Sequence, residues 1–464
     1  MTDLLDLTIR DLVAGYRAKT LSPHEYWLTV EARIEAFEPH VAALYAYDPQ
    51  GAREQAKAST ERWLRDEPVG PLDGIPVSLK ELIATKGQPV PLGTAAVELT
   101  PAEEDAPIAA RMKEDGAVIF AKTTCPDYGM LSSGLSSFHP LSRNPWDVTQ
   151  NPGGSSAGAA AAGAAGYGPL HIGTDIGGSV RLPAGWTGLF GFKPSHGRIP
   201  VDPYYVGRCA GPMTRSVDDA AFSMATLSRP DWRDGTSLPP NDFDWMDHDI
   251  DVRGMKIGVM LDAGCGLAVD IEIRDAVLAA AKRFEDAGAV VVEVAPVLTR
   301  QMLDGLDMFW RAKFWGDIRN LSEERRAKIL PYIYQWAEKG ADVTGFEAVQ
   351  GFGQTIEMRK TCGRLFTTVD AVLSPTNPIV SYPADWASPT NDPEKPFEHI
   401  AFTVPWNMSE QPAASINCGF SKTGMPIGLQ VVGPRFDDMR VLKLSKLFET
   451  WTGGVTNWPK PPVA

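Results

Sequence analysis

The stretch GTDIGGSVRLPA, residues 173–184, places Ser179 directly after two glycines, Gly177 and Gly178. Paired glycines let the backbone turn sharply, so that successive N–H groups can point at one place. Such N–H groups can hold the oxyanion that forms during acyl transfer. The order differs from the G-x-S-x-G nucleophile elbow, because Arg181 occupies the last position. Taken alone, the stretch is equally consistent with a structural turn.

Two other segments carry groups of chemical interest. NPGGSSAG at residues 151–158 leads into the alanine-rich run 159–165, and a glycine-rich loop before a helix can present N–H groups to an anion. It is not a phosphate-binding P-loop, because no lysine follows the glycines. GIPVSLKE at residues 74–81 puts Lys80 at the end of an apolar strand, where a charged amine is costly to bury. Taken singly, a tight turn and a surface lysine explain these segments better.

Together the three segments resemble the amidase signature family. GFKP at 191–194, GR at 197–198 and GMPIGLQ at 424–430 continue the same pattern. The resemblance covers nearly the whole chain and is weakest at about 225–400. It implies an α/β fold with one large, mixed, twisted β-sheet covered by helices on both faces. It also implies hydrolysis of the C–N bond of a linear carboxylic amide, without a cofactor or metal.

The resemblance implies a Ser–cis-Ser–Lys triad, with Ser179 as nucleophile, Ser155 as bridging serine and Lys80 as base. A serine hydroxyl is a poor nucleophile until a base removes its proton. Lys80 can do so only when neutral, so its pKa must fall from about 10.4 to about 7. Burial can supply such a shift. In relatives the peptide bond that matches Gly154–Ser155 is cis.

The family pattern also assigns the residues around the triad. The oxyanion hole is expected from the backbone N–H groups of Ile176, Gly177, Gly178 and Ser179. Asp175 and Arg181 are expected to hold this loop through charge-assisted hydrogen bonds, and Ser156 to support Lys80. Gly129 and Met130 match a segment that lines the acyl pocket in relatives such as fatty acid amide hydrolase.

We expect residues 1–65 to form a helical N-terminal flank. SPHE at 22–25 combines a capping serine, a proline at the first helical position and a glutamate three residues after the cap. The large apolar residues that follow recur at helical spacing. We expect Pro39 to end this helix.

The rest of the chain has the pattern of an α/β core. A strand–helix–strand pattern is predicted by apolar runs and helical periodicity at 255–261, 270–287 and 289–294. No long Gly/Ser/Pro linker separates the halves. We therefore expect one domain over 1–464, with the α/β core at 66–464 and a helical insertion at about 300–360.

Composition excludes several other classes of protein. The net charge of −14 over 464 residues disfavours general binding to nucleic acid or to an anionic membrane surface. The start shows no signal-peptide pattern, and no run of 18 large apolar residues predicts a membrane span. No C-x-x-C pair occurs among the five cysteines Cys125, Cys209, Cys265, Cys362 and Cys418. Free thiols favour a cytoplasmic location. The expected partner is a small-molecule amide, and a homodimer is common among relatives.

The substrate is the least determined feature. Large aromatic side chains gather in the predicted insertion, at Phe309, Trp310, Phe314, Trp315, Tyr332, Tyr334 and Trp336. If several of them line the pocket, aryl or alkyl amides are favoured over small polar ones. Aromatic residues at helical spacing, however, more often belong to a core.

Two alternatives remain open. The glutaminase component of glutamyl-tRNA amidotransferase, its A subunit, shares the triad, but its usual Ala-Ser-Ser-Asn-Leu-Ala-Arg-Tyr-Asp-Gly segment is absent from residues 307–336. A binding protein that has lost turnover is disfavoured, because all three triad residues are present. A Ser–His pair is also conceivable, since His171 lies eight residues before Ser179, but the family has no catalytic histidine there and we expect His171 to pack in the interior.

Overall fold

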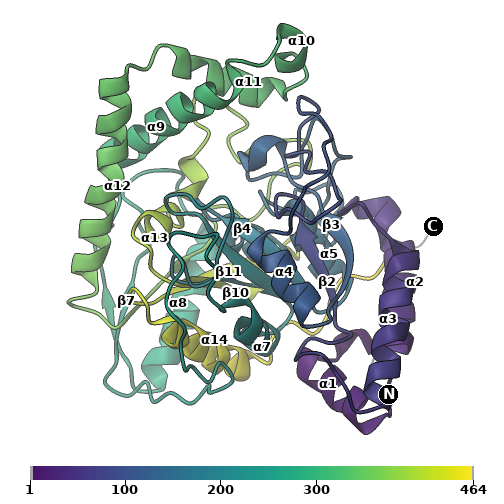
Figure 1. The fold of residues 1–464 in the computed structure, drawn as a ribbon. Helices are drawn as coiled ribbons and strands as arrows, with labels where there is room; N and C mark the ends of the chain where they lie inside the picture. Colours follow the sequence, from purple (N-terminus) through teal and green to yellow (C-terminus); the bar gives the residue numbers. More distant parts are fainter. Residues whose placement is uncertain (1–3, 462–464) are drawn as a thin grey trace.

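The computed structural model describes residues 4–461, and within them it forms an 11-stranded β-sheet (Figure 1). The strand order is β1-β3-β2-β4-β6-β5-β10-β11-β9-β7-β8. The sheet is mixed: β2 runs parallel to β3 and β4, whereas β10 runs antiparallel to β5 and β11. The strands are β1 Leu44–Tyr45, β2 Pro76–Lys80, β3 Val118–Thr123, β4 Leu170–Asp175, β5 Phe190–Lys193, β6 Cys209–Thr214, β7 Lys256–Val259, β8 Val290–Glu293, β9 Ala371–Pro375, β10 Ala413–Phe420 and β11 Pro426–Val432.

Helices cover both faces of this sheet. On β11, Leu429 and Val431 belong to the main apolar core with α8 and α14, whereas Gln430 points to the other face and accepts a hydrogen bond from Arg181 of α6. The prediction of one mixed sheet between helices is confirmed. The α-helices are α1 Ile9–Ala18, α2 Pro23–Val41, α3 Pro49–Leu64, α4 Pro107–Glu114, α5 Ala157–Ala165, α6 Arg181–Thr187, α7 Val217–Leu227, α8 Ile271–Asp286, α9 Arg300–Ile318, α10 Glu323–Arg326, α11 Pro331–Glu338, α12 Gly345–Leu365, α13 Val404–Met408 and α14 Asp438–Thr452. Short 3-10 helices are η1 Leu4–Asp6, η2 Asp127–Gly129, η3 Lys339–Ala341 and η4 Glu398–Ile400.

The first three long helices form the N-terminal flank, and α2 begins at the predicted capping box of Ser22 and Glu25. The prediction that Pro39 ends this helix is wrong, because α2 continues to Val41 and ends where Ala42 adopts a left-handed conformation. Proline removes one backbone hydrogen bond and crowds the carbonyl four residues back, and near the end of α2 the helix accommodates both for one further turn or less.

Helices α9 to α12 cover residues 300–365, where the helical insertion was expected, and they lie outside the sheet at the upper left of Figure 1. Helices α9 and α12 approach closely at two glycines. A Cβ on Gly351 would lie 2.4 Å from the carbonyl oxygen of Gly305, so this contact requires glycine. This packing positions α9, whose side chains Trp310 and Phe314 line the cavity described below. Within residues 4–461 no helix is long and apolar enough to cross a membrane.

We expect Trp27→Ala to lower the free energy of unfolding by about 3–5 kcal/mol, because it empties a large volume in the core between α2 and the sheet. Trp27 is 0% exposed and packs on Phe120 of β3. The matched control is Leu28→Ala, where the side chain is 43% exposed and the loss should stay within about 0.5 kcal/mol. Urea denaturation measures both; equal losses would contradict this account of the core.

Candidate active site

Lys80 is the last residue of β2 and is fully buried. Its amine lies among three hydroxyl groups. Lys80 Nζ donates hydrogen bonds to Ser155 Oγ at 2.7 Å, to Thr174 Oγ1 at 3.1 Å and to Ser156 Oγ at 3.2 Å. These partners satisfy the amine without a negative charge. The structure thus brings together Lys80, Ser155 and Ser156, as the family pattern implies.

Burial lowers the pKa of Lys80 to about 8, because the apolar interior disfavours its charged form. Nearby acidic groups, including Glu81 and Asp175, oppose this effect, and the guanidinium of Arg208 adds to it. A substantial fraction of Lys80 is therefore neutral slightly above neutral pH. A neutral amine can accept a proton from a hydroxyl partner.

The loop that carries Ser155 is held by close backbone contacts. The peptide bond between Gly154 and Ser155 is cis. A Cβ on Gly154 would lie 2.4 Å from the backbone nitrogen of Ser133, so a side chain cannot be accommodated there. Ser156 follows as the N-cap of α5, and its backbone N–H donates to the carbonyl oxygen of Ser179 at 3.3 Å. The two serine loops are thereby joined.

The Ser179 loop is held by a buried ion pair. Arg181 donates to both carboxylate oxygens of Asp175, at 2.9 and 3.0 Å, and both side chains are fully buried. Burial alone would raise the pKa of Asp175, but the charge and hydrogen bonds of Arg181 outweigh burial and hold that pKa well below its ordinary value. The carboxylate also accepts the N–H of Val180. The expected charge-assisted bonds of Asp175 and Arg181 are present.

One of the four amides expected in the oxyanion hole is already engaged. The N–H of Gly178 donates to Asp175 Oδ1 at 2.8 Å, so it is not available to a substrate oxygen, and that part of the prediction is wrong. The reason is that Asp175 closes the turn with its own side chain. Within residues 4–461, the N–H groups of Ile176, Gly177 and Ser179 make no hydrogen bond and remain available.

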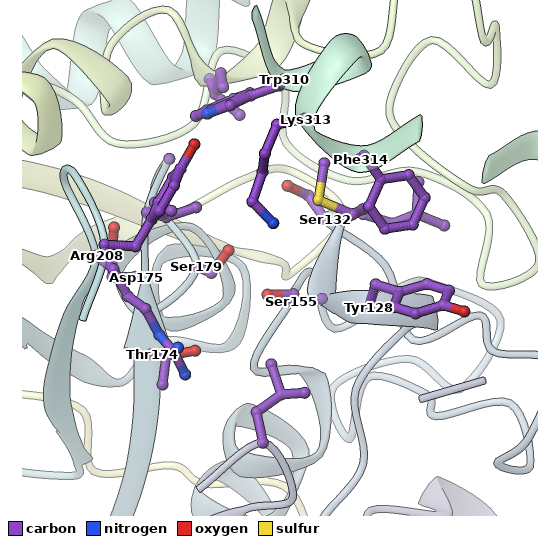
Figure 2. A pocket seen from close by; sticks show the side chains of 18 of the residues that line it. Tyr128, Ser132, Ser155, Thr174, Asp175, Ser179, Arg208, Trp310, Lys313 and Phe314 are labelled. Atoms are coloured by element: carbon purple, nitrogen blue, oxygen red, sulfur yellow. The ribbon is translucent and has the colours of Figure 1, made fainter. Parts of the chain in front are cut away.

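A cavity of about 530 Å³ opens over these groups (Figure 2). Ser155 and Ser179 both line it, although their hydroxyls form no hydrogen bond with each other in the described part of the chain. Catalytic hydrogen bonds are often long before substrate binds. Gly129 and Met130 also line the cavity, as expected. The complete lining consists of Leu82, Leu92, Tyr128, Gly129, Met130, Leu131, Ser132, Ser155, Thr174, Asp175, Ile176, Gly177, Ser179, Pro203, Tyr204, Tyr205, Arg208, Trp310, Lys313, Phe314, Asp317, Phe397, His399 and Ile400.

Comparison with known proteins agrees with this geometry. Residues 27–442 match the family model described as Amidase. The chain belongs to the amidase signature family. It is accordingly an enzyme that acts on amide C–N bonds.

The similar proteins carry the names of different activities. The A subunit of glutamyl-tRNA(Gln) amidotransferase from Myxococcus xanthus is 32% identical over 483 residues, which covers 96% of this chain and 97% of that protein. The structure of a bacterial aryl acylamidase of the amidase signature family has a TM-score of 0.88 at 29% identity and covers 96% of this chain and 97% of its own. The corresponding amidotransferase protein of Thermotoga maritima has a TM-score of 0.79 at 26% identity, covering 100% of this chain and 99% of its own.

His171 in this amidase signature enzyme faces away from Ser179. Its Nδ1 shares a 2.7 Å hydrogen bond with Ser78 Oγ, and its Nε2 one of 3.2 Å with the carbonyl oxygen of Gly168. Burial lowers the pKa of His171 to about 3, so the ring is neutral. Both nitrogens are occupied by Ser78 and Gly168, so His171 forms no pair with Ser179.

Only two of the seven singled-out aromatic residues, Trp310 and Phe314, line the cavity, and both come from α9. Trp336 is buried behind them and donates to Asp307. Sequence reasoning missed three charged residues in the cavity wall, Arg208, Lys313 and Asp317. It also missed Thr174 as a partner of Lys80, although this residue lies directly before Asp175 in the opening motif.

We expect Arg181→Met to lower the free energy of unfolding by about 3–5 kcal/mol, because it leaves the carboxylate of Asp175 buried without its partner. The matched control is Arg253→Met. Arg253 also pairs with an aspartate, Asp251, but its side chain is 79% exposed, so no measurable change is expected. Thermal unfolding measures both variants. A small effect of Arg181→Met would show that Asp175 is adequately held by its other donors.

Proposed function

We propose that this protein hydrolyses the C–N bond of a small-molecule amide through an acyl-enzyme on Ser179, with Ser155 as proton relay and Lys80 as base. The observation that carries the proposal is the Lys80 amine, buried and hydrogen-bonded to Ser155 on the floor of the cavity that Ser179 lines. A lysine in that environment has the lowered pKa that a general base needs.

In the first half-reaction, Ser179 Oγ attacks the carbonyl carbon while its proton passes to Ser155 and the proton of Ser155 passes to Lys80. The oxyanion receives hydrogen bonds from the free N–H groups of the Ile176–Ser179 turn. Each such donor typically contributes about 3–4 kcal/mol to transition-state stabilisation. The turn needs no rearrangement for this, because Asp175 already fixes its shape.

The C–N bond then breaks as the proton travels back from Lys80 through Ser155 to the leaving nitrogen. This gives ammonia or an amine and leaves the acyl group esterified to Ser179. In the second half-reaction, water replaces the amine. Its proton is taken by the same relay, its oxygen attacks the ester carbonyl, and the carboxylic acid leaves with Ser179 restored. The relay ends each cycle in its starting protonation state.

The cavity favours a substrate with an apolar body. Trp310, Phe314 and Ile400 contribute apolar wall opposite the hydroxyl groups, and burial of aromatic or alkyl surface against them favours aryl or alkyl amides. The aryl acylamidase named above, which is 29% identical, supports the same choice.

Glutamine is the second candidate substrate. It is favoured by the 32% identity to the amidotransferase protein of Myxococcus xanthus over almost the whole chain. The segment at 307–336 lacks the sequence usual in such proteins and supplies cavity aromatics instead. Ammonia release from glutamine, together with co-purification of partner proteins, would favour this candidate. Hydrolysis of anilides and alkyl amides by the isolated chain would favour the first.

We expect Ser179→Ala to abolish amide hydrolysis and covalent labelling by a fluorophosphonate probe, because no other oxygen replaces the nucleophile. The variant should keep its thermal unfolding temperature. Ser322→Ala, at an exposed helix cap outside the cavity, should be labelled like the wild type. Intact-protein mass spectrometry measures the label; undiminished labelling of Ser179→Ala would overturn the assignment.

We also expect activity to rise with pH. Lys80 acts as base only when neutral and has a pKa of about 8, so kcat/KM should increase about tenfold per pH unit below 8 and level off above it. Lys80→Met should lose activity by orders of magnitude and lose this dependence. Rates on one amide substrate from about pH 6 to about pH 10 measure both, and a flat wild-type profile would contradict Lys80 as base.

A further inference from the structure

Two cationic side chains line the cavity, and neither makes a bond or moves a proton in the proposed chemistry, although Arg208 helps to lower the pKa of Lys80. Arg208 lies directly before β6, and Lys313 lies on α9. Their presence contrasts with the protein as a whole, which carries a net charge of −14. The cavity of this acidic protein thus carries two positive side chains whose role the proposed function does not explain.

Arg208 is largely without hydrogen-bond partners of its own. Its Nη1 donates to the backbone oxygen of Pro203 at 2.7 Å, and within residues 4–461 no carboxylate forms an ion pair with it. Asp202 and Asp234 act on it only from a distance. A guanidinium has five N–H donors in a fork that matches a carboxylate, and a partly buried one is normally paired. Arg181 differs directly, because it pairs with Asp175 and donates its remaining hydrogen bonds to Gln430, Asn407 and the carbonyl oxygen of Thr403.

Lys313 points at the reacting groups. Figure 2 shows its side chain reaching from α9 toward Ser179 and Ser155, with Arg208 on the side where Thr174 and Asp175 lie. Its Nζ pairs with Asp317, one helical turn further on, and lies 5.5 Å from the ring centre of Tyr205. The side chain is 44% exposed, so the ammonium can reach into the cavity or remain with Asp317.

The charges around the cavity leave a positive excess. Asp317 is the single carboxylate there that can offset two cations, because Asp175 is neutralised by Arg181 among the lining residues described. A cleft with apolar walls focuses such a field and attracts anions.

We propose that the substrate is an amide that also carries a carboxylate, and that Arg208 and Lys313 bind this carboxylate while Ser179 attacks the amide carbonyl. The inference rests on the proposed function and names its substrate class. Two kinds of compound carry both an amide and a carboxylate. One is an amide of a simple dicarboxylic or aryl acid; the other is an amino-acid amide such as glutamine, whose ammonium group would meet Asp317.

The test compares three carboxylate substrates, glutaramate, a 4-carboxyanilide and glutamine, each with its methyl ester, which lacks the carboxylate charge. Amide cleavage is followed as release of amine or ammonia. A charge-assisted contact in an apolar cavity corresponds to a preference of about 10- to 100-fold in kcat/KM. We expect the wild type to prefer at least one carboxylate by this margin. Arg208→Gln and Lys313→Met should each reduce the ratio of kcat/KM for the acid to kcat/KM for its ester about tenfold or more.

The matched control is Lys282→Met. Lys282 forms the same kind of pair with an aspartate four residues later, Asp286, but on α8 and outside the cavity lining. Lys282→Met should therefore show the same ratio of acid to ester hydrolysis as the wild type. Asp317→Asn separates a binding role from a structural one: it frees Lys313 and should raise the preference for glutaramate. If glutamine is the substrate, the same variant should lower its use, because its ammonium group loses a partner.

A second measurement does not depend on turnover. Glutarate or 4-acetamidobenzoate should slow fluorophosphonate labelling of Ser179 in the wild type more than the neutral esters do, and this difference should vanish in Lys313→Met. Equal hydrolysis of acids and esters, or equal protection by them, would overturn the inference and leave the proposed function intact. Absence of both labelling and hydrolysis would instead overturn the proposed function.

Discussion

The proposed chemistry depends on one amine, that of Lys80, which is fully buried and surrounded by hydroxyl groups rather than carboxylates. A carboxylate partner would have stabilised the charged form and removed the base. Hydroxyl partners satisfy the hydrogen bonds of either form, so burial decides the pKa. The fold supports this arrangement by bringing the ends of two parallel strands, β2 and β4, next to the loop of Ser155.

The two arginines near the cavity, Arg181 and Arg208, differ in how many hydrogen-bond partners they have. Arg181 and Asp175 form a closed pair whose role is to hold a turn in one shape, and neither group has capacity left for a ligand. Arg208 forms no ion pair with a carboxylate in the described part of the chain, and most of its donors stay free. Arg181, which stabilises the turn, thus has its hydrogen-bond donors engaged, whereas Arg208 keeps donors that can bind a ligand.

The sequence predicted well what depends on local pattern. Lys80, Ser155 and Ser156 stand in short motifs, and the apolar runs at 255–261 and 289–294 did become the strands β7 and β8. The failures arise where a side chain decides the outcome in three dimensions. The N–H of Gly178 was lost to Asp175, which no pattern of glycines reveals.

The cavity wall was beyond prediction for the same reason. Arg208 and Lys313 lie more than a hundred residues apart and share no motif, so only the packing of α9 over the serine loops brings them together. Of the aromatic residues nearby, helical spacing could not distinguish Phe314, which faces the cavity, from Trp336, which packs behind it.

The origin of the cavity wall has a consequence for how such an enzyme can change. Trp310, Lys313 and Phe314 all come from one helix, α9, whereas the hydroxyls and the amine come from the sheet and its loops. Apart from Arg208, which lies directly before β6, the side chains proposed to select the substrate therefore reside on a different piece of the chain from those proposed to react. Replacements along one face of α9 can redirect the enzyme to new compounds while the proton-transfer apparatus stays untouched, a division that suits both natural divergence and laboratory redesign.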